Sequence, residues 1–317
     1  MRRRDFLGTL AGAAAPRRSA PRPNIVLILA DDLGYGDLGC YGQRIIATPH
    51  IDRLAAEGLR FTQAYSGASV CAPSRCCLMT GLHTGHARIR GNHGPSGERV
   101  SLRGSDLTVA EVLKQAGYRT ACFGKWGIGE AGTDGVPNRQ GFDEWYGFLN
   151  QDHALEYFPT HIWRNERETF PDGNQGAKRK EYMQDLFTKR ALEFIGEQGR
   201  QPFFLFLPFT LPHANSELGR DTGNGFPVPD FGPYADKTWP TPEKGFAATM
   251  SHLDSSVGQV MEALQRKGLD RNTLVILSSD NGPALDGGHS PEFFASAGPL
   301  RGRKGMLYEG GIRVPSI

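Results

Sequence analysis

Residues 23–32 read PNIVLILADD, an apolar run that begins after a proline and ends at two aspartates. A short apolar run bounded by turn-forming residues predicts a strand that is buried on both faces of a sheet. Residues 203–209 (FFLFLPF) and 273–278 (TLVILS) have the same character. Because such strands present no polar face, the sequence predicts a sheet with helices packed on both sides.

The segments between these strands carry helical periodicity. Helices are expected over residues 51–57, 105–118, 185–198 and 246–267, and from Cys71 through Thr80, with a further strand over 119–123. This alternation predicts an α/β fold with a mostly parallel or mixed sheet sandwiched between helices. Residues 127–174 and 215–242 show no sustained period, and we expect them to form long loops.

Charge is distributed unevenly along the chain. The 317 residues include 36 basic and 34 acidic side chains, but residues 1–22 alone contain six arginines and one acid. The remaining residues are therefore slightly acidic. They offer no bulk electrostatic basis for binding nucleic acid or an anionic membrane, so neither is an expected partner.

Residues 1–22 are expected to form a leader. They begin MRRRDFLGTLAGAAA, and Arg-Arg-x-Phe-Leu before a weakly apolar run resembles a bacterial twin-arginine signal. This run is shorter than the roughly 20 residues that span a bilayer, and no other segment is long enough. The sequence predicts export to the periplasm or exterior, no stable membrane span, and one domain over residues 23–317.

Oxygen-bearing side chains follow the first and last of the predicted buried strands. Asp31 and Asp32 end the first, and Asp280 and Asn281 follow the last. Because ligands bind beyond the carboxyl ends of strands in open α/β sheets, these side chains are expected to converge. An all-oxygen set favours Ca²⁺ or Mg²⁺ over zinc. The alternative is that each pair only caps a turn or a helix.

The segment Cys71-Ala72-Pro73-Ser74-Arg75 opens the helix that runs to Thr80. A thiol at a helix N-terminus, with Arg75 one turn on, is expected to have a lowered pKa. The alternative is a buried structural cysteine. The chain has five cysteines and no C-x-x-C pair, so neither a disulfide framework nor a zinc knuckle can be read from their spacing.

The Cys71-x-Pro73-Ser74-Arg75 segment, followed by Leu78-x-Thr80-Gly81, resembles the signature of the type I sulfatases. Further motifs of that family occur in order along the chain. They are residues 23–39 around Asp31-Asp32, residues 48–55 (TPHIDRLA), Gly124-Lys125-Trp126, Leu211-Pro212-His213, Asp280-Asn281-Gly282, and Lys304 with residues 308–313 (YEGGIR). The order of these pieces is more specific than any one of them except the Cys71 segment.

The resemblance implies an alkaline-phosphatase-like fold that hydrolyses sulfate esters of carbohydrates or aryl alcohols. A separate maturation enzyme would oxidise Cys71 to Cα-formylglycine, whose hydrate attacks sulfur. Ca²⁺, with Mg²⁺ as the alternative, would be held by five residues, which are Asp31, Asp32, Cys71, Asp280 and Asn281.

The resemblance also assigns roles to other side chains. Arg75 would lower the pKa of the attacking hydroxyl, and Lys125 and Lys304 would bind the remaining sulfuryl oxygens. His213 would protonate the departing alcohol. The expected partners are a sulfated small molecule or glycan and the maturation enzyme.

The sequence departs from the family pattern in two places. Many members have histidine where Gly127 stands, and His153, His83 or His289 are candidates to replace it. Family chains also continue into a smaller C-terminal domain that is missing here, so we expect the sequence to be a fragment. Two other functions stay open: a phosphonate or phosphate ester hydrolase, and a catalytically impaired remnant that binds sulfated ligands.

Overall fold

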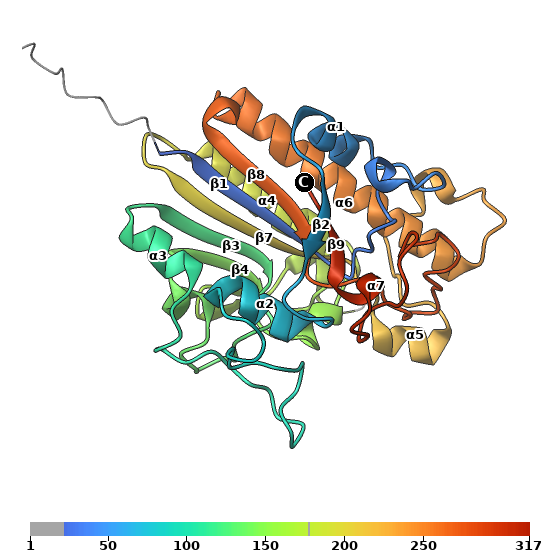
Figure 1. Ribbon diagram of the computed structural model, residues 1–317, viewed down its shortest axis with the longest axis horizontal. Helices are drawn as coiled ribbons and strands as arrows, with labels where there is room; N and C mark the ends of the chain where they lie inside the picture. The colour runs from blue at the N-terminus through green and yellow to red at the C-terminus, as the bar shows by residue number, and fades with distance from the viewer. Residues whose placement is uncertain (1–21, 177) are drawn as a thin grey trace, which may run out of the picture.

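The computed structural model describes residues 22–176 and 178–317 (Figure 1). The expected leader therefore lies outside the described residues, apart from Arg22. The strands are β1 (Asn24–Asp31), β2 (Phe61–Tyr65), β3 (Arg119–Lys125), β4 (Glu144–Phe148), β5 (Ile162–Arg164), β6 (Arg167–Thr169), β7 (Phe203–Pro212), β8 (Thr273–Ser279) and β9 (Arg313–Ser316). The α-helices are α1 (Pro49–Glu57), α2 (Cys71–Thr80), α3 (Val109–Gln115), α4 (Met183–Gly196), α5 (Ser216–Thr222), α6 (Thr241–Arg266) and α7 (Glu309–Ile312). None of the helices in this part of the chain is long and apolar enough to cross a membrane.

The strands of the described residues form one mixed sheet in the order β2-β9-β8-β1-β7-β3-β4-β5-β6. The five strands from β8 to β4 run parallel, and antiparallel strands extend both edges. β1 lies between β8 and β7, with Ala30 in register with Ser279. The carboxyl ends of these central strands therefore meet at one edge of the sheet, where α/β proteins of this kind bind ligands.

Helices cover both faces of this sheet. α1, α4 and α6 pack on one face, and α2 and α3 lie on the other (Figure 1). Side chains of β7 alternate between the two layers: Leu205 and Leu207 join the core under α4 and α6, whereas Phe204 and Phe206 join the core under α2 and α3. The prediction of a mostly parallel or mixed sheet sandwiched between helices is confirmed.

Most predicted elements form, with shifted ends. The helix expected over residues 105–118 begins only at Val109, because Thr108 and Glu111 form a capping box that fixes its first turn. The prediction of loops over residues 127–174 and 215–242 is wrong in part, because these stretches contain β4, β5, β6 and α5. β5 and β6 have three residues each, and α5 buries none of its residues, so neither produces a readable apolar period.

Candidate active site

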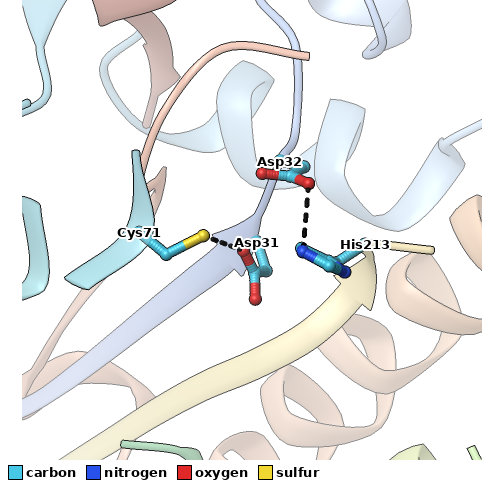
Figure 2. Close-up of side chains that lie close together, drawn as sticks. All are labelled: Asp31, Asp32, Cys71 and His213. Atoms are coloured by element: carbon cyan, nitrogen blue, oxygen red, sulfur yellow. Dashed lines mark hydrogen bonds and ion pairs between the residues drawn. The ribbon is translucent and has the colours of Figure 1, made fainter. Parts of the chain in front are cut away.

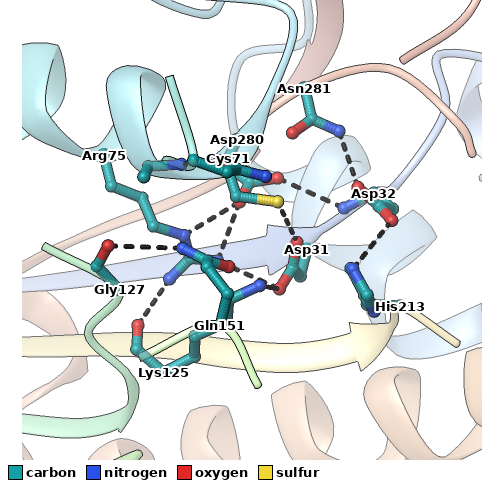
Figure 3. Close-up of polar contacts among 12 residues, drawn as sticks. Asp31, Asp32, Cys71, Arg75, Lys125, Gly127, Gln151, His213, Asp280 and Asn281 are labelled. Carbon is teal, nitrogen blue, oxygen red and sulfur yellow. Dashed lines mark hydrogen bonds and ion pairs between the residues drawn. The ribbon is translucent and has the colours of Figure 1, made fainter. Parts of the chain in front are cut away.

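Two pairs of polar side chains meet where β1 and β8 end. Asp31 is the last residue of β1, Asp32 follows it, and Asp280 and Asn281 follow β8. The backbone N–H of Asp32 donates to Asp280 Oδ1 (3.2 Å), and Asn281 Nδ2 donates to Asp32 Oδ1 (2.7 Å) (Figure 3). All four side chains are buried. The parallel pairing of β1 and β8 thus brings together residues that lie about 250 positions apart in the sequence.

Cys71 is the first residue of α2 and is fully buried beside these carboxylates. Its Sγ lies 3.2 Å from Asp31 Oδ1 (Figure 2). Burial, and then the charge of Asp31, raise the pKa of the Cys71 thiol. The expectation of a lowered thiol pKa is therefore wrong, because loss of water and a neighbouring carboxylate both disfavour a thiolate. A purely structural cysteine would pack among apolar side chains, whereas Cys71 contacts the polar cluster through Asp31.

Arg75 lies one turn after Cys71 on the same helix and is itself buried. Its Nε and Nη2 lie 2.9 Å and 2.8 Å from Asp280 Oδ2, and its Nη2 lies 3.4 Å from Asp31 Oδ2. Its Nη1 donates to the carbonyl oxygen of Lys125 (2.5 Å) (Figure 3). A planar guanidinium with several fixed donors can therefore bridge two carboxylates and a strand end.

Two lysines complete the charge balance. Lys125, the last residue of β3, places Nζ 2.5 Å from Asp31 Oδ2. Lys304 Nζ lies 2.7 Å from Asp32 Oδ1 and 2.8 Å from Asp32 Oδ2, and its side chain keeps 18% of its surface exposed. Three basic side chains thus face three carboxylates in one buried network, which is how proteins hold several charges away from water.

His213 follows β7 and faces Asp32. Its Nε2 lies 3.5 Å from Asp32 Oδ2 (Figure 2), and its Nδ1 lies 2.6 Å from the carbonyl oxygen of Ala214. Nδ1 therefore carries a proton, and Nε2 is the nitrogen directed at the cluster. Tyr157 donates from its hydroxyl to the His213 carbonyl oxygen (2.6 Å), which fixes the local backbone. Burial, and then the charge of Lys304, lower the pKa of His213.

The two carboxylates nearest Arg75 differ in their protonation. Burial alone would raise the pKa of Asp31, but Lys125, His213 and Arg75 hold it well below its ordinary value. Burial, and then the charge of Asp31, raise the pKa of Asp280 to about 7. At neutral pH the basic side chains of the network therefore leave Asp280 only partly ionised.

These residues fit a hard divalent cation. Asn281 Oδ1 is buried and has no hydrogen-bond partner among the described residues. Together with Asp31, Asp32 and Asp280 it gives an all-oxygen donor set, which suits Ca²⁺ or Mg²⁺. Ligand atoms of Asp31, Asp32, Cys71 and His213 also lie within 4.8 Å of one another. A cation here would satisfy the unpaired amide oxygen and favour the ionised form of Asp280.

Two histidines considered as replacements at Gly127 lie elsewhere. His289 is buried, pairs through Nδ1 with Glu243 Oε2 (2.5 Å) and stacks on Phe246. His83 is exposed beyond the end of α2, where its Nδ1 accepts from the backbone N–H of Gly85. Neither makes a hydrogen bond or an ion pair with the cluster in the described part of the chain.

His153, the third candidate, belongs to a separate group with Glu156 and His161. The imidazole rings of His153 and His161 stack 4.1 Å apart at an interplanar angle of 13°, and His153 Nε2 lies 2.9 Å from the His161 carbonyl oxygen. The nitrogens of the two stacked rings therefore lie in nearly parallel planes. Burial, and then the charge of His161, lower the pKa of His153 to about 4.

The sequence reasoning missed Gln151 and Tyr157. Gln151 Nε2 donates to the carbonyl oxygen of Gly127 (3.3 Å) beside the cluster (Figure 3). Tyr157 fixes the backbone at His213. Both lie in a segment without periodicity, and their positions depend on strand pairing at a distance. A local sequence pattern carries no signal for either contact.

The fold and the site together define an α/β protein with a candidate site for a hard cation and a buried cysteine at the carboxyl ends of its strands. Residues 23–317 match the profile of the family described as Sulfatase. The N-acetylgalactosamine-6-sulfatase of Rattus norvegicus is 35% identical over 98% of this chain and 58% of its own length. The N-acetylgalactosamine-6-O-sulfatase of Bacteroides thetaiotaomicron is 30% identical over 95% of this chain and 68% of its own length. The crystal structure of Ps i-CgsB in complex with k-i-k-neocarrahexaose has a TM-score of 0.75 and 31% identity, over 93% of this chain and 65% of that one.

The chain belongs to the sulfatase family, as a type I sulfatase of the alkaline phosphatase superfamily. It spans less than two thirds of the length of the rat relative. The family membership predicted from the ordered motifs is therefore confirmed.

Proposed function

We propose that this chain carries the catalytic centre of a sulfatase that hydrolyses sulfate esters. The observation that supports this most directly is the position of Cys71, which is buried at the start of α2 beside Asp31 and one turn before Arg75. Two of the relatives are an N-acetylgalactosamine-6-sulfatase and an N-acetylgalactosamine-6-O-sulfatase, and the similar structure holds k-i-k-neocarrahexaose, which together support a sulfated sugar as the substrate class. Residues 1–22 would direct the protein to the periplasm or the exterior.

Two groups would complete this site. A maturation enzyme would convert Cys71 to Cα-formylglycine, which supplies a hydrated aldehyde as the nucleophile. A Ca²⁺ ion, with Mg²⁺ as the alternative, would be held by Asp31, Asp32, Asp280, Asn281 and residue 71, and would polarise the ester.

The basic side chains would bind and orient the sulfate group. Arg75 already bridges Asp31 and Asp280, so its guanidinium is held rigidly beside residue 71. Lys125 and Lys304 pair with Asp31 and Asp32, and a cation at those carboxylates would compete with them. Each lysine could then direct its Nζ at an anionic oxygen. Fixed positive charge aimed at the developing anion is the main way such a site lowers a barrier.

His213 would give a proton to the departing alcohol from Nε2. Its Nδ1 is held by the Ala214 carbonyl oxygen, so only Nε2 is available. Burial and Lys304 lower the pKa of His213, whereas the Asp32 carboxylate, 3.5 Å away, opposes them. An anionic substrate beside the ring would also favour the protonated form.

Sulfate release tests the proposal. The chain, produced together with a formylglycine-generating enzyme, is assayed with 4-nitrophenyl sulfate and with 6-sulfated N-acetylgalactosamine, before and after chelation. Cys71→Ala is expected to abolish sulfate release. Cys76→Ala should retain it, because Cys76 lies on the same helix but packs into the core under α2 and α3.

The same assay separates the other two functions. A higher kcat/KM for 4-nitrophenyl phosphate than for the sulfate would favour a phosphate or phosphonate ester hydrolase. Binding of the sulfated sugar without turnover, by protein whose residue 71 is fully converted, would favour a binding remnant.

A further inference from the structure

Gly127 leaves a space beside Arg75 that another residue fills. A Cβ atom built on Gly127 would lie 2.7 Å from Gln151 Nε2 and 3.4 Å from Arg75 Cδ. The first distance is closer than real Cβ atoms approach other atoms, so a side chain at position 127 would require the Gln151 carboxamide to move from its present place. Gly127 also has φ +79, in the left-handed region that favours glycine.

The backbone holds Gln151 at this place. The pairing of β3 and β4 continues past both strands: Trp126 N–H donates to the Phe148 carbonyl oxygen (2.8 Å) and Gly127 N–H to that of Leu149 (2.9 Å). Gln151 follows Leu149 by two residues. The strand pairing that delivers Lys125 to the cluster therefore also delivers Gln151.

The Gln151 carboxamide has hydrogen-bonding capacity to spare. Its hydrogen bond from Nε2 to the Gly127 carbonyl oxygen is long, at 3.3 Å, and Oε1 makes none with the described residues. Each amide nitrogen carries two donors, so at least one N–H is left for a ligand. The side chain is partly buried, and Figure 3 shows its hydrogen bond to Gly127 next to the cluster that contains Arg75.

We propose, building on the proposed function, that Gln151 is a substrate-binding residue whose Nε2 donates to an oxygen of the sulfuryl group beside Arg75. Among the described residues, the rings of His83, His153 and His289 bond to Gly85, His161 and Glu243 and not to this cluster. A carboxamide carries no charge and does not titrate, so it contributes a directed donor without adding a proton-transfer group. The sulfuryl group is thus bound by charged donors from Arg75 and the lysines and by one neutral donor from Gln151.

The test measures anion binding as well as turnover. Calorimetric titration with inorganic sulfate is carried out on the full chain and on Gln151→Ala, Gln151→Glu and Gln265→Glu. Gln265 is exposed near the end of α6 and makes no hydrogen bond with the cluster in the described part of the chain, and its substitution makes the same chemical change as Gln151→Glu. Melting temperatures of all four proteins show whether each variant is folded, and kcat/KM for 4-nitrophenyl sulfate is measured in parallel.

Gln151→Ala is expected to weaken sulfate binding about 10- to 100-fold, the effect of losing one hydrogen bond to a charged group. Gln151→Glu should weaken it further, because a carboxylate repels the anion, and Gln265→Glu should bind like the unchanged chain. Equal sulfate affinity in the unchanged chain and both Gln151 variants would overturn the inference, even if the enzyme hydrolyses aryl sulfates. Weakened binding in a chain that hydrolyses no sulfate ester would uphold Gln151 as an oxyanion-binding residue and reject the proposed function.

Discussion

Individual side chains in this cluster owe their charge state to their position. Asp31 and Asp280 both contact Arg75, yet nearby cations hold the pKa of Asp31 well below its ordinary value, while burial and the charge of Asp31 raise that of Asp280 to about 7. Cys71 behaves like Asp280, because burial and the charge of Asp31 raise the pKa of its thiol and keep it protonated. The unmodified thiol is therefore a poor nucleophile here, which supports the proposed conversion of Cys71 before the site can act.

At this scale, replacing His213 should have an effect that depends on the leaving group. His213→Gln removes the proton donor, so kcat for a sugar sulfate should fall by about 10²- to 10⁴-fold, the usual contribution of general acid catalysis. 4-Nitrophenyl sulfate should lose far less, because its leaving group departs without a proton. Steady-state kinetics on both substrates measure the difference, with His252→Gln on α6 as the control. Equal losses on the two substrates would show that His213 does not protonate the leaving group.

His153 should make the stability of the protein depend on pH. Burial and His161 lower its pKa from 6.5 to about 4, so the unfolded state takes up this proton first as the pH falls. The contribution of His153 to the free energy of unfolding is fully present above about pH 6.5. It is lost as the pH falls to about 4, and a pKa shift of this size corresponds to about 3 kcal/mol. Denaturant unfolding at several pH values should show a smaller acid-side loss in His153→Phe than in the unchanged chain. A loss as large in His153→Phe as in a His83→Phe control would contradict this assignment.

Three element ends build the site: the carboxyl ends of β1 and β8 and the start of α2. They bring Asp32 to Asp280 and Cys71 to Asp31 from three parts of the chain. A ligand that bridges these ends should stabilise the folded protein, because the unfolded chain offers no such set of oxygens.

Calcium should therefore raise the melting temperature, and chelation should reverse the rise. At a free Ca²⁺ concentration about 100 times the dissociation constant, the gain is about 2.7 kcal/mol. Thermal unfolding with and without Ca²⁺ measures this increment. It should largely disappear in Asn281→Ala, which removes the unpaired amide oxygen, and persist in Asn224→Ala, which changes a loop outside the cluster. An unchanged increment in Asn281→Ala would remove this residue from the ligand set.

The elements that sequence patterns predict are those with strong apolar signals. β1, β7 and β8 are visible as apolar runs, and their carboxyl ends placed Asp31, Asp32, Asp280 and Asn281 together from topology alone. β2 was missed because none of its residues is buried, and β5 and β6 because three residues carry no period. The roles expected of Lys125, Lys304 and His213 came only from the family resemblance. Gln151 could not be predicted, since its place beside Gly127 depends on the backbone pairing of Gly127 with Leu149.

For the whole molecule, stability rests on a sheet that buries side chains on both faces. β7 lies at the centre of the parallel strands and contributes to both cores. Phe206→Ala should therefore cost about 3–5 kcal/mol of unfolding free energy, through lost burial and the cavity it leaves. Leu307→Ala, at a side chain that is 83% exposed, should change it by less than about 0.5 kcal/mol. Denaturant titration measures both, and a similar small change in both variants would mean that β7 is not central to stability.

The central claim is that residue 71 becomes the nucleophile of a sulfate ester hydrolase. Peptide mass spectrometry across residue 71, on a preparation with measured sulfate release, tests it most directly. The account predicts a peptide that has lost its sulfur and gained a carbonyl, in a fraction that rises with specific activity. A fully active preparation whose residue 71 remains entirely an unmodified thiol would contradict it.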